Sequence, residues 1–352
     1  MPKDNENVPL PLLTTDGPPE ALAPQSFAPD QMVRCEECLR ANPPTRVNCL
    51  YCAAVLPLNE TSINLQKPAL RPLEKWERGY NNILLPPPAN LSEAALAEAA
   101  DALRLTTADL SRILSIGMKL PLARAATIDE ASLVQFRLGR LEINTQIVPD
   151  ADLGLDETRP FKVRAAGIDD SGIYVFPTPE TPATKLSWAN VVLMVVGRLI
   201  VKRVELKEQK ASRAENRILD ASEFFTDESV VEIYTIEQAA PYRIAANSFD
   251  FSCLENRKSL LTHENMSGLL SLFREHAPDA VFDDSYNSLR KALEAVWPSE
   301  QQNETRGWRR ERPGKYSIGS VNEISNENQF LRYSRLRYYF LSQGKTKTDD
   351  DA

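Results

Sequence analysis

The sequence predicts a multi-domain α+β protein, and three observations along the chain support that prediction. Two C-x-x-C pairs lie within residues 32–57. Apolar residues recur at helical spacing between short apolar runs over residues 80–150, and they alternate as in β-strands over 158–298. A chain of 352 residues is long enough for two or three domains. We therefore expect a small cysteine-held segment, a small α/β domain, and a β-barrel or sandwich closed by a helix.

Charge and hydropathy favour a soluble, cytoplasmic protein. The formal net charge is -8, which argues against a general attraction to nucleic acid or anionic lipid. The longest apolar run, 191–196, has the length of a strand and falls well short of the roughly 18 residues of a membrane helix. The N-terminus lacks the basic start and apolar core of a signal peptide. Five cysteines, four of them in metal-binding spacing, fit a reducing compartment.

Four cysteines are spaced as ligands of one metal ion. The two C-x-x-C pairs are separated by ten residues, so two chain reversals can bring four thiolates to the corners of a tetrahedron. The predicted ligands are Cys35, Cys38, Cys49 and Cys52. Because four protein ligands leave no open coordination position, we expect one structural Zn²⁺ that stabilises this segment and performs no chemistry. Another metal and chance spacing are the alternatives.

With Asn42 between the two pairs, the spacing resembles that of a zinc ribbon of the nucleoporin-type (Ran-binding-protein) zinc-finger family. The resemblance implies a module that binds ubiquitin, small GTPases or single-stranded RNA. This chain has Val33 where that family has tryptophan, and Leu39 and Ala53 where zinc-ribbon knuckles favour glycine. The segment can dock a partner or can serve only as a folding staple, and the sequence leaves both interpretations open.

The segments on either side of this ribbon lack a folding pattern. Residues 1–31 are rich in proline and polar residues and are predicted to be disordered. Residues 58–79 contain prolines but no sustained periodicity, which indicates a linker.

Residues 80–150 are predicted to form a compact α/β domain. Three short apolar runs predict strands, at 83–85, 120–125 and 145–148. Helical spacing between them predicts three helices, with N-caps at Ser92, Thr107 and Thr127. The predicted order is strand, helix, helix, strand, helix, strand.

This order of elements resembles the C-terminal domain of the bacterial ribosomal stalk protein, over residues 81–150. That family binds translation GTPases through a lysine-rich helical face. The matching helical segment here, 92–101, contains no lysine. The resemblance therefore implies the fold and not that partner.

From residue 158 the pattern becomes that of a β domain. Alternation predicts about six or seven strands, with a break at Gly197 and a loop or exposed helix at 206–217. Helical spacing returns in 269–273 and 288–296. Strands followed by a helix resemble a pleckstrin-homology-like barrel, so we expect such a barrel or sandwich over 158–298, with helices at its C-terminal end.

Catalysis has little support in the sequence. Only two histidines are present, and no phosphate-binding, dinucleotide-binding or hydrolase motif occurs. Cys253 with His263 could form a nucleophile–base pair, and Asp283 with Asp284 could bind a metal. We expect Cys253 to be a buried structural thiol instead, and the two acids to lie at the start of a helix. The chain is predicted not to be an enzyme.

Residues 299–352 are expected to form a basic, aromatic tail with a disordered end from 345 onward. Residues 304–340 contain eight basic residues and four acids, a balance of +4 in an acidic protein. Arginines beside Trp308 and Tyr316 could stack on bases or bind phosphates. We favour pairing of this tail with the acidic surface of the same protein, because the overall charge opposes nucleic-acid binding.

Together these observations predict a bacterial, cytoplasmic zinc-binding adaptor or scaffold that binds an unidentified protein partner without catalysis. A nucleic-acid or ribosome-associated factor, using the ribbon and the basic tail, is the first alternative. An enzyme with an unrecognised site is the second. The sequence leaves the oligomeric state undetermined.

Overall fold

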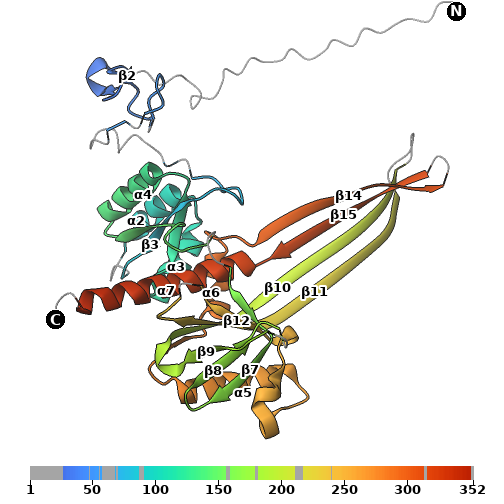
Figure 1. The fold of residues 1–352 in the computed structure, drawn as a ribbon. Coiled ribbons are helices and arrows are strands. Elements are labelled where there is room, and N and C mark those ends of the chain that lie inside the picture. Colours follow the sequence, from blue (N-terminus) through green and yellow to red (C-terminus); the bar gives the residue numbers. More distant parts are fainter. Residues whose placement is uncertain are drawn as a thin grey trace, which may run out of the picture. The chain divides into compact units, whose positions relative to one another are not determined.

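The computed structural model describes residues 27–46, 48–54, 56–57, 68, 70–86, 91–155, 159–178, 181–210, 217–238, 240–312 and 315–349. The chain divides into two compact units, Met1–Lys67 and Pro68–Ala352 (Figure 1). Most of the segment expected to be disordered, 1–31, lies outside the described residues, and so does the first half of the expected linker. Among the described helices, none combines the length and the apolar composition needed to cross a membrane.

The first unit is a small fold built around the four cysteines. Its described elements are the 3-10 helix η2 (Pro29–Gln31) and the strands β1 (Val33–Arg34) and β2 (Ala41–Asn42). The two strands pair antiparallel, with Val33 opposite Asn42. Its buried apolar cluster consists of Val33, Cys35, Cys49 and Leu56. A core of this size stabilises little by itself.

The second unit begins with the predicted α/β segment. Its elements are β3 (Tyr80–Leu84), α2 (Glu93–Leu103), α3 (Thr107–Ile116), β4 (Pro121–Ala125), α4 (Ile128–Arg140) and β5 (Thr145–Pro149). The strands form an antiparallel sheet in the order β4-β3-β5. Pro121, which has no N–H to donate, lies on an edge strand. The order of elements is the one that the sequence predicts.

Capping residues determine where these helices begin and end. Ser92 and Thr127 each accept a hydrogen bond from a backbone N–H in the first turn of the helix that follows, at 3.1 and 3.2 Å. The cap of α3 is Thr106, one residue before the predicted Thr107. Gly117 ends α3 with φ 70°, a conformation that glycine adopts without strain.

The rest of the second unit contains two sheets. A three-stranded sheet has the order β7 (Ala165–Asp169), β8 (Gly172–Phe176), β9 (Thr184–Ser187). The members of a seven-stranded sheet are β6 (Phe161–Val163), β10 (Val191–Lys210), β11 (Arg217–Thr235), β12 (Tyr242–Ala245), β13 (Val281–Asp283), β14 (Glu300–Arg312) and β15 (Lys315–Ser325). Its path runs β14-β15-β10-β11-β12-β6, and β13 pairs with β10.

Helices connect and cover these sheets. Three are short 3-10 helices, η3 (Trp188–Asn190), η4 (Ala246–Ser248) and η5 (Phe251–Arg257). Three are α-helices, α5 (Thr262–His276), α6 (Tyr286–Leu293) and α7 (Glu327–Asp349). In Figure 1, α7 leaves the end of β15 and runs back across the unit.

Two strands are much longer than predicted. β10 continues through Gly197, where the sequence predicted a break. Of the loop or helix expected at 206–217, residues 206–210 belong to β10 and Arg217 begins β11, and 211–216 lie outside the described residues. The polar end of β10 is extended because it pairs with β11 on one side and with β15 on the other. Periodicity within β10 itself carries no information about these partner strands. Packing explains the glycine instead, because a Cβ at Gly197 would lie 2.4 Å from a ring carbon of Phe330.

The segment expected to be a tail is part of the fold. β14 and β15 form a hairpin, and β15 pairs with β10 along Val201–Lys210. α7 follows and buries Phe330, Tyr333 and Leu336, and it extends to Asp349, within the stretch expected to be disordered. The hairpin sequence is largely polar, so its structure depends on a partner strand about a hundred residues away, and local patterning could not reveal it.

Two hydrophobic cores organise the second unit. The first joins the α/β segment to α6 and α7, and it contains Ile83 together with Tyr286 and Phe330. The second lies between the β7-β8-β9 sheet, strands β10 to β12 and α5, and it contains Trp188 and Phe273. Because the first core crosses the boundary predicted near residue 150, the two predicted domains share a hydrophobic interior.

Candidate metal centre

The first unit contains two backbone turns of the same design, one for each cysteine pair. In the first, Leu39 N–H donates to Cys35 O at 2.9 Å, and Cys35 N–H donates to Arg40 O at 3.0 Å. In the second, the N–H of Ala53 donates to Cys49 O at 3.0 Å, and Cys49 N–H donates to Ala54 O at 2.7 Å. Each turn presents two sulfur atoms to the same point. The repeated pattern is the local structure that the C-x-x-C spacing predicts.

Each turn closes on a residue in the left-handed region. Leu39 has φ 58° and Ala53 has φ 61°. These are the two positions at which the sequence lacks the favoured glycine, and a non-glycine residue there costs about 1–2 kcal/mol. Such strain persists when the surroundings require the conformation, and here the convergence of four sulfur atoms requires it.

The four predicted ligands lie together. The sulfur atoms of Cys35, Cys38, Cys49 and Cys52 are all within 4.8 Å of one another. Cys35 Sγ lies 3.6 Å from Cys52 Sγ, and Cys38 Sγ lies 3.5 Å from Cys49 Sγ. A tetrahedral zinc with Zn–S bonds of about 2.3 Å needs sulfur atoms about 3.8 Å apart. The group can therefore hold one metal ion with four thiolate ligands, and a tetrahedral set of four sulfur atoms suits zinc or iron.

Asn42 supports this cluster from the side. Its amide nitrogen donates to Cys49 Sγ at 3.4 Å, and its carbonyl oxygen accepts from Leu50 N–H at 2.8 Å. The side chain is completely buried, and it ties the first turn to the second. The spacing in the sequence indicated this asparagine, and the structure shows that it contacts one of the four sulfur atoms.

The hydrogen bonds make the four thiols unequal. Burial raises the pKa of Cys49, but hydrogen bonds from the N–H groups of Tyr51 and Cys52 and from Asn42 outweigh it and lower that pKa to about 6. A backbone hydrogen bond lowers the pKa of Cys52, but burial and the three neighbouring cysteines raise it to about 12. A bound divalent cation would favour the thiolate form at every position, because ligation requires deprotonated sulfur.

Val33 occupies the position at which the nucleoporin-type family has tryptophan, and here it is a core residue. It is buried against Cys35 and Leu56. This position therefore supplies packing within the unit.

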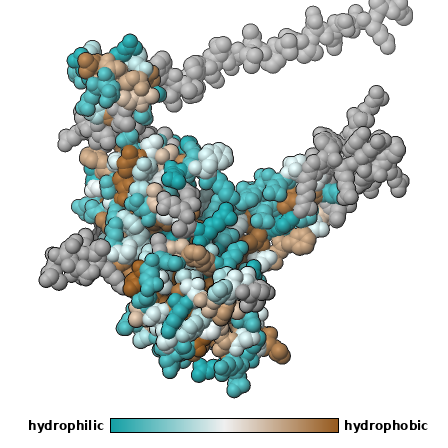
Figure 2. Space-filling model, viewed as in Figure 1, coloured by the Kyte–Doolittle hydropathy of each residue, from teal (hydrophilic) through white to brown (hydrophobic). Residues whose placement is uncertain are grey.

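An apolar surface flanks the cluster instead. Leu39, Leu50 and Tyr51 are each more than half exposed, at 60, 52 and 56%. Arg40 lies over the Tyr51 ring, with its guanidinium carbon 4.7 Å from the ring centre. Figure 2 shows brown apolar side chains among polar ones on this unit. These four residues, which we call the knuckle surface, lie in or beside the two turns.

The residues considered for nucleophilic catalysis lie on different elements. Cys253 lies in η5 and is partly buried, and burial raises the pKa of its thiol to about 11. His263 lies in the first turn of α5 and is exposed. Among the described contacts no hydrogen bond joins the two side chains. His276 stacks on Trp188, with ring centres 5.1 Å apart, and packs against the second core.

The two adjacent acids point to different partners. Asp283 is buried at the end of β13, accepts from Tyr333 Oη at 2.8 Å and pairs with Arg337 Nε at 2.6 Å. Asp284 is exposed and lies 3.6 Å from Arg274. Asp283 thus anchors α7 to the sheet, and the two carboxylates do not form a cation site.

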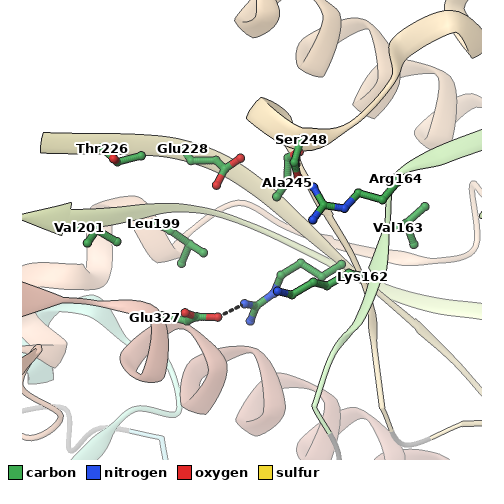
Figure 3. A pocket seen from close by; sticks show the side chains of 11 residues that line it. Lys162, Val163, Arg164, Leu199, Val201, Thr226, Glu228, Ala245, Ser248 and Glu327 are labelled. Carbon is green, nitrogen blue, oxygen red and sulfur yellow. Dashed lines mark hydrogen bonds and ion pairs between the residues drawn. The ribbon is translucent and has the colours of Figure 1, made fainter. Parts of the chain in front are cut away.

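A shallow cavity of 300 Å³ lies where β6, β10, β11 and β12 meet the start of α7 (Figure 3). Its wall includes the apolar side chains of Leu199 and Val201 and the cations Lys162 and Arg164. Arg243 pairs with Glu327 at 2.5 Å, drawn as a dashed line in Figure 3. The Ser248 hydroxyl in its wall donates to Ala245 O at 3.3 Å.

Comparison with known proteins found no matching family model, no matching curated protein and no matching solved structure.

Proposed function

We propose that this chain is a non-catalytic zinc-binding adaptor that docks a protein partner on the knuckle surface of its first unit. One structural Zn²⁺, held by Cys35, Cys38, Cys49 and Cys52, would fold that unit. The observation that carries the proposal is the exposure of Leu39, Leu50 and Tyr51 beside the four sulfur atoms.

The exposed side chains favour a docking role over a purely structural one. A metal site that only stabilises the fold needs its ligands and a small core, and two leucines and a tyrosine that face solvent do not add to its stability. Exposed aromatic and aliphatic side chains beside an arginine have the composition of interface hot spots. The partner would offer an apolar groove with a carboxylate near Arg40, because that guanidinium lies at the edge of the apolar group.

Affinity capture from the native cell tests this function. Full-length protein is compared with the double variant Leu50→Ser/Tyr51→Ser, and Leu260→Ser, which changes a fully exposed leucine of the second unit, is the matched control. We expect a partner that the double variant loses by about tenfold or more and that the control retains. Equal capture by all three proteins, with zinc still bound, would show that the knuckle surface has no docking role.

The finer architectural assignments belong to the same proposal. The four-sulfur geometry supports a zinc ribbon, and the order of elements in β3 to β5 supports a stalk-protein-like domain. Two sheets packed with α5 around one core support a pleckstrin-homology-like β domain. Free cysteines in metal spacing support a reducing cytoplasm, and the stalk-like segment supports a bacterial origin.

A nucleic-acid-binding role is the second candidate, and one observation favours it. The basic residues expected in a C-terminal tail lie in two places. Some belong to α7, and the others belong to the β14–β15 hairpin of the seven-stranded sheet.

A further inference from the structure

Four strands continue beyond the body of the second unit as one ribbon. They are the distal parts of β10 and β11 and the hairpin β14–β15, in the order β14-β15-β10-β11 (Figure 1). We call this ribbon the arm. Residues far apart in sequence meet along it, since Arg306 and Lys207 are both opposite Gly319, and Arg310 and Lys210 are both opposite Tyr316.

The distal end of the arm is a basic part of an acidic protein. Of the described residues there, 306–312 and 315–319 carry five basic residues and one acid, and 207–210 and 217–220 carry three basic residues and two acids. Eight minus three gives +5 for these strand segments, which the strand register places side by side. The chain as a whole carries -8, so the remainder carries -13. Charge separation on this scale steers a polyanion to one end of the molecule.

The basic residues of the expected tail therefore lie in two different environments. On α7, Arg332 pairs with Asp150 at 2.7 Å and Arg337 pairs with Asp283 at 2.6 Å, as expected for a segment that packs on the acidic body. The basic residues of the hairpin instead occupy strands of the arm. Packing on the acidic body therefore describes the helix, and the hairpin forms a separate group of basic residues along the arm.

The register also groups aromatic and basic residues on one face. Trp308 is opposite Ile318, and Arg310 is opposite Tyr316. Opposite residues in an antiparallel pair share a face, and so do residues two apart in a strand. Trp308, Arg310 and Tyr316 therefore belong to the same face of the arm, together with Lys210 and Glu208 from the neighbouring strand, since Glu208 is opposite Ile318.

We propose that the distal arm binds single-stranded nucleic acid, with the arginines and lysines contacting phosphates and Trp308 and Tyr316 stacking on bases. Aromatic and basic residues on one face of a sheet suit unpaired bases. A duplex groove suits the arm less, because four strands span about 14 Å and the major groove is about 12 Å wide. This surface lies in the second unit and does not depend on the metal centre.

Fluorescence anisotropy with full-length protein and labelled single strands of roughly 20 nucleotides tests the proposal. We expect binding at about 0.15 M salt that weakens steeply as salt rises. The triple change Arg309→Ala, Arg310→Ala and Arg312→Ala should flatten the log–log salt slope by up to about 2, at ~0.7 per phosphate contact. Trp308→Ala should weaken binding by about 5- to 150-fold and leave the slope unchanged.

Two further variants keep the test decisive. Removing three exposed cations near α5, by Arg257→Ala, Lys258→Ala and Arg274→Ala, lowers the charge equally and should not alter the slope. Replacing the three arm arginines with lysine should preserve the slope, which separates lost charge from misfolding. No binding at about 0.15 M salt, or equal effects of the two alanine triples, would overturn the proposal. Equal affinity for duplex without a Trp308 effect, or binding only to phosphatidylserine vesicles, would also overturn it.

Discussion

Arg332 of α7 donates a hydrogen bond to the buried carboxylate of Asp150, at the end of the α/β segment, across 182 residues of sequence. Asp150 also accepts from the N–H of Gly79 and from the side chain of Asn81, both at 2.9 Å, and it pairs with Arg124 at 2.5 Å. One carboxylate thus connects β3, β4 and β5 with the last helix. This network, together with the first hydrophobic core, joins the two segments that the sequence predicted to be separate.

Asp150→Asn should destabilise the second unit by about 3–5 kcal/mol at neutral pH, because Arg124 and Arg332 would remain buried without a counter-charge. Burial raises the pKa of Asp150, but Arg332 and Arg124 outweigh it and hold that pKa below its usual value of 3.8. The carboxylate therefore stabilises the fold fully above pH 3.8, and this contribution is lost as pH falls through the lower folded pKa. Denaturant unfolding of wild type and Asp150→Asn at several pH values measures the difference in unfolding free energy.

The exposed Asp279→Asn is the control for that prediction and should change stability by less than about 0.5 kcal/mol. A stability difference between wild type and Asp150→Asn that stays constant from pH 7 to pH 3 would contradict the role of the charge.

Gly197→Ala should destabilise the second unit by about 1–3 kcal/mol, since the new Cβ would lie 2.4 and 2.6 Å from ring carbons of Phe330 and 3.0 Å from Tyr286. Gly139→Ala, in α4, has no atom within 4 Å of the new Cβ and should stabilise by about 0.5–1 kcal/mol. Thermal melts of the two variants give the comparison. If both shift the melting temperature in the same direction, the contact with Phe330 does not limit this position.

Purified protein should contain about one zinc ion per chain, and Cys49→Ser should release it, because three sulfur ligands do not complete the tetrahedron. Cys253→Ser, which removes the cysteine outside the cluster, should keep full occupancy. Elemental analysis of the three proteins measures this. Zinc-free wild type, or full zinc in Cys49→Ser, would refute the metal site.

Leu39→Gly should stabilise the first unit by about 1 kcal/mol, because glycine adopts φ 58° without the steric cost of a side chain. The side chain is 60% exposed, so little packing is lost. Competition with a zinc chelator should show about five-fold tighter zinc binding. Leu50→Gly is the matched control, since Leu50 is similarly exposed and is not among the positive-φ residues, and it should weaken binding.

Residues 68–352 should unfold in one cooperative transition, and a fragment covering 80–150 should not melt cooperatively. The fragment would expose Ile83 and its neighbours, which pack in the same core as Tyr286 and Phe330, and it would lose the hydrogen bond from Trp297 to Asn81. Calorimetry of the two polypeptides distinguishes one shared core from the two separate domains that the change of sequence pattern suggested. Two resolved transitions would restore the boundary near residue 155.

Local signals account for what the sequence by itself determined. The two C-x-x-C pairs identify the four clustered cysteines because a tight turn places residues three apart together. Ser92, Thr127 and Gly117 mark helix ends because a cap acts within one turn of chain. The order of strands and helices in residues 80–149 follows from the same short-range patterns.

The tertiary structure decided everything that depends on distant partners. The polar strands of the arm carry no periodic signal, and they are strands because β15 finds β10 across more than a hundred residues. Gly197 resembles a strand break in the sequence, but Phe330 of α7 explains it. Only the tertiary structure showed three further features. They are the strain at Leu39 and Ala53, the exposure of the knuckle surface, and the division of the basic residues between the body and the arm. Hydrogen-bonded pairing and core packing join residues without regard to their separation in the chain, so a local pattern cannot report them.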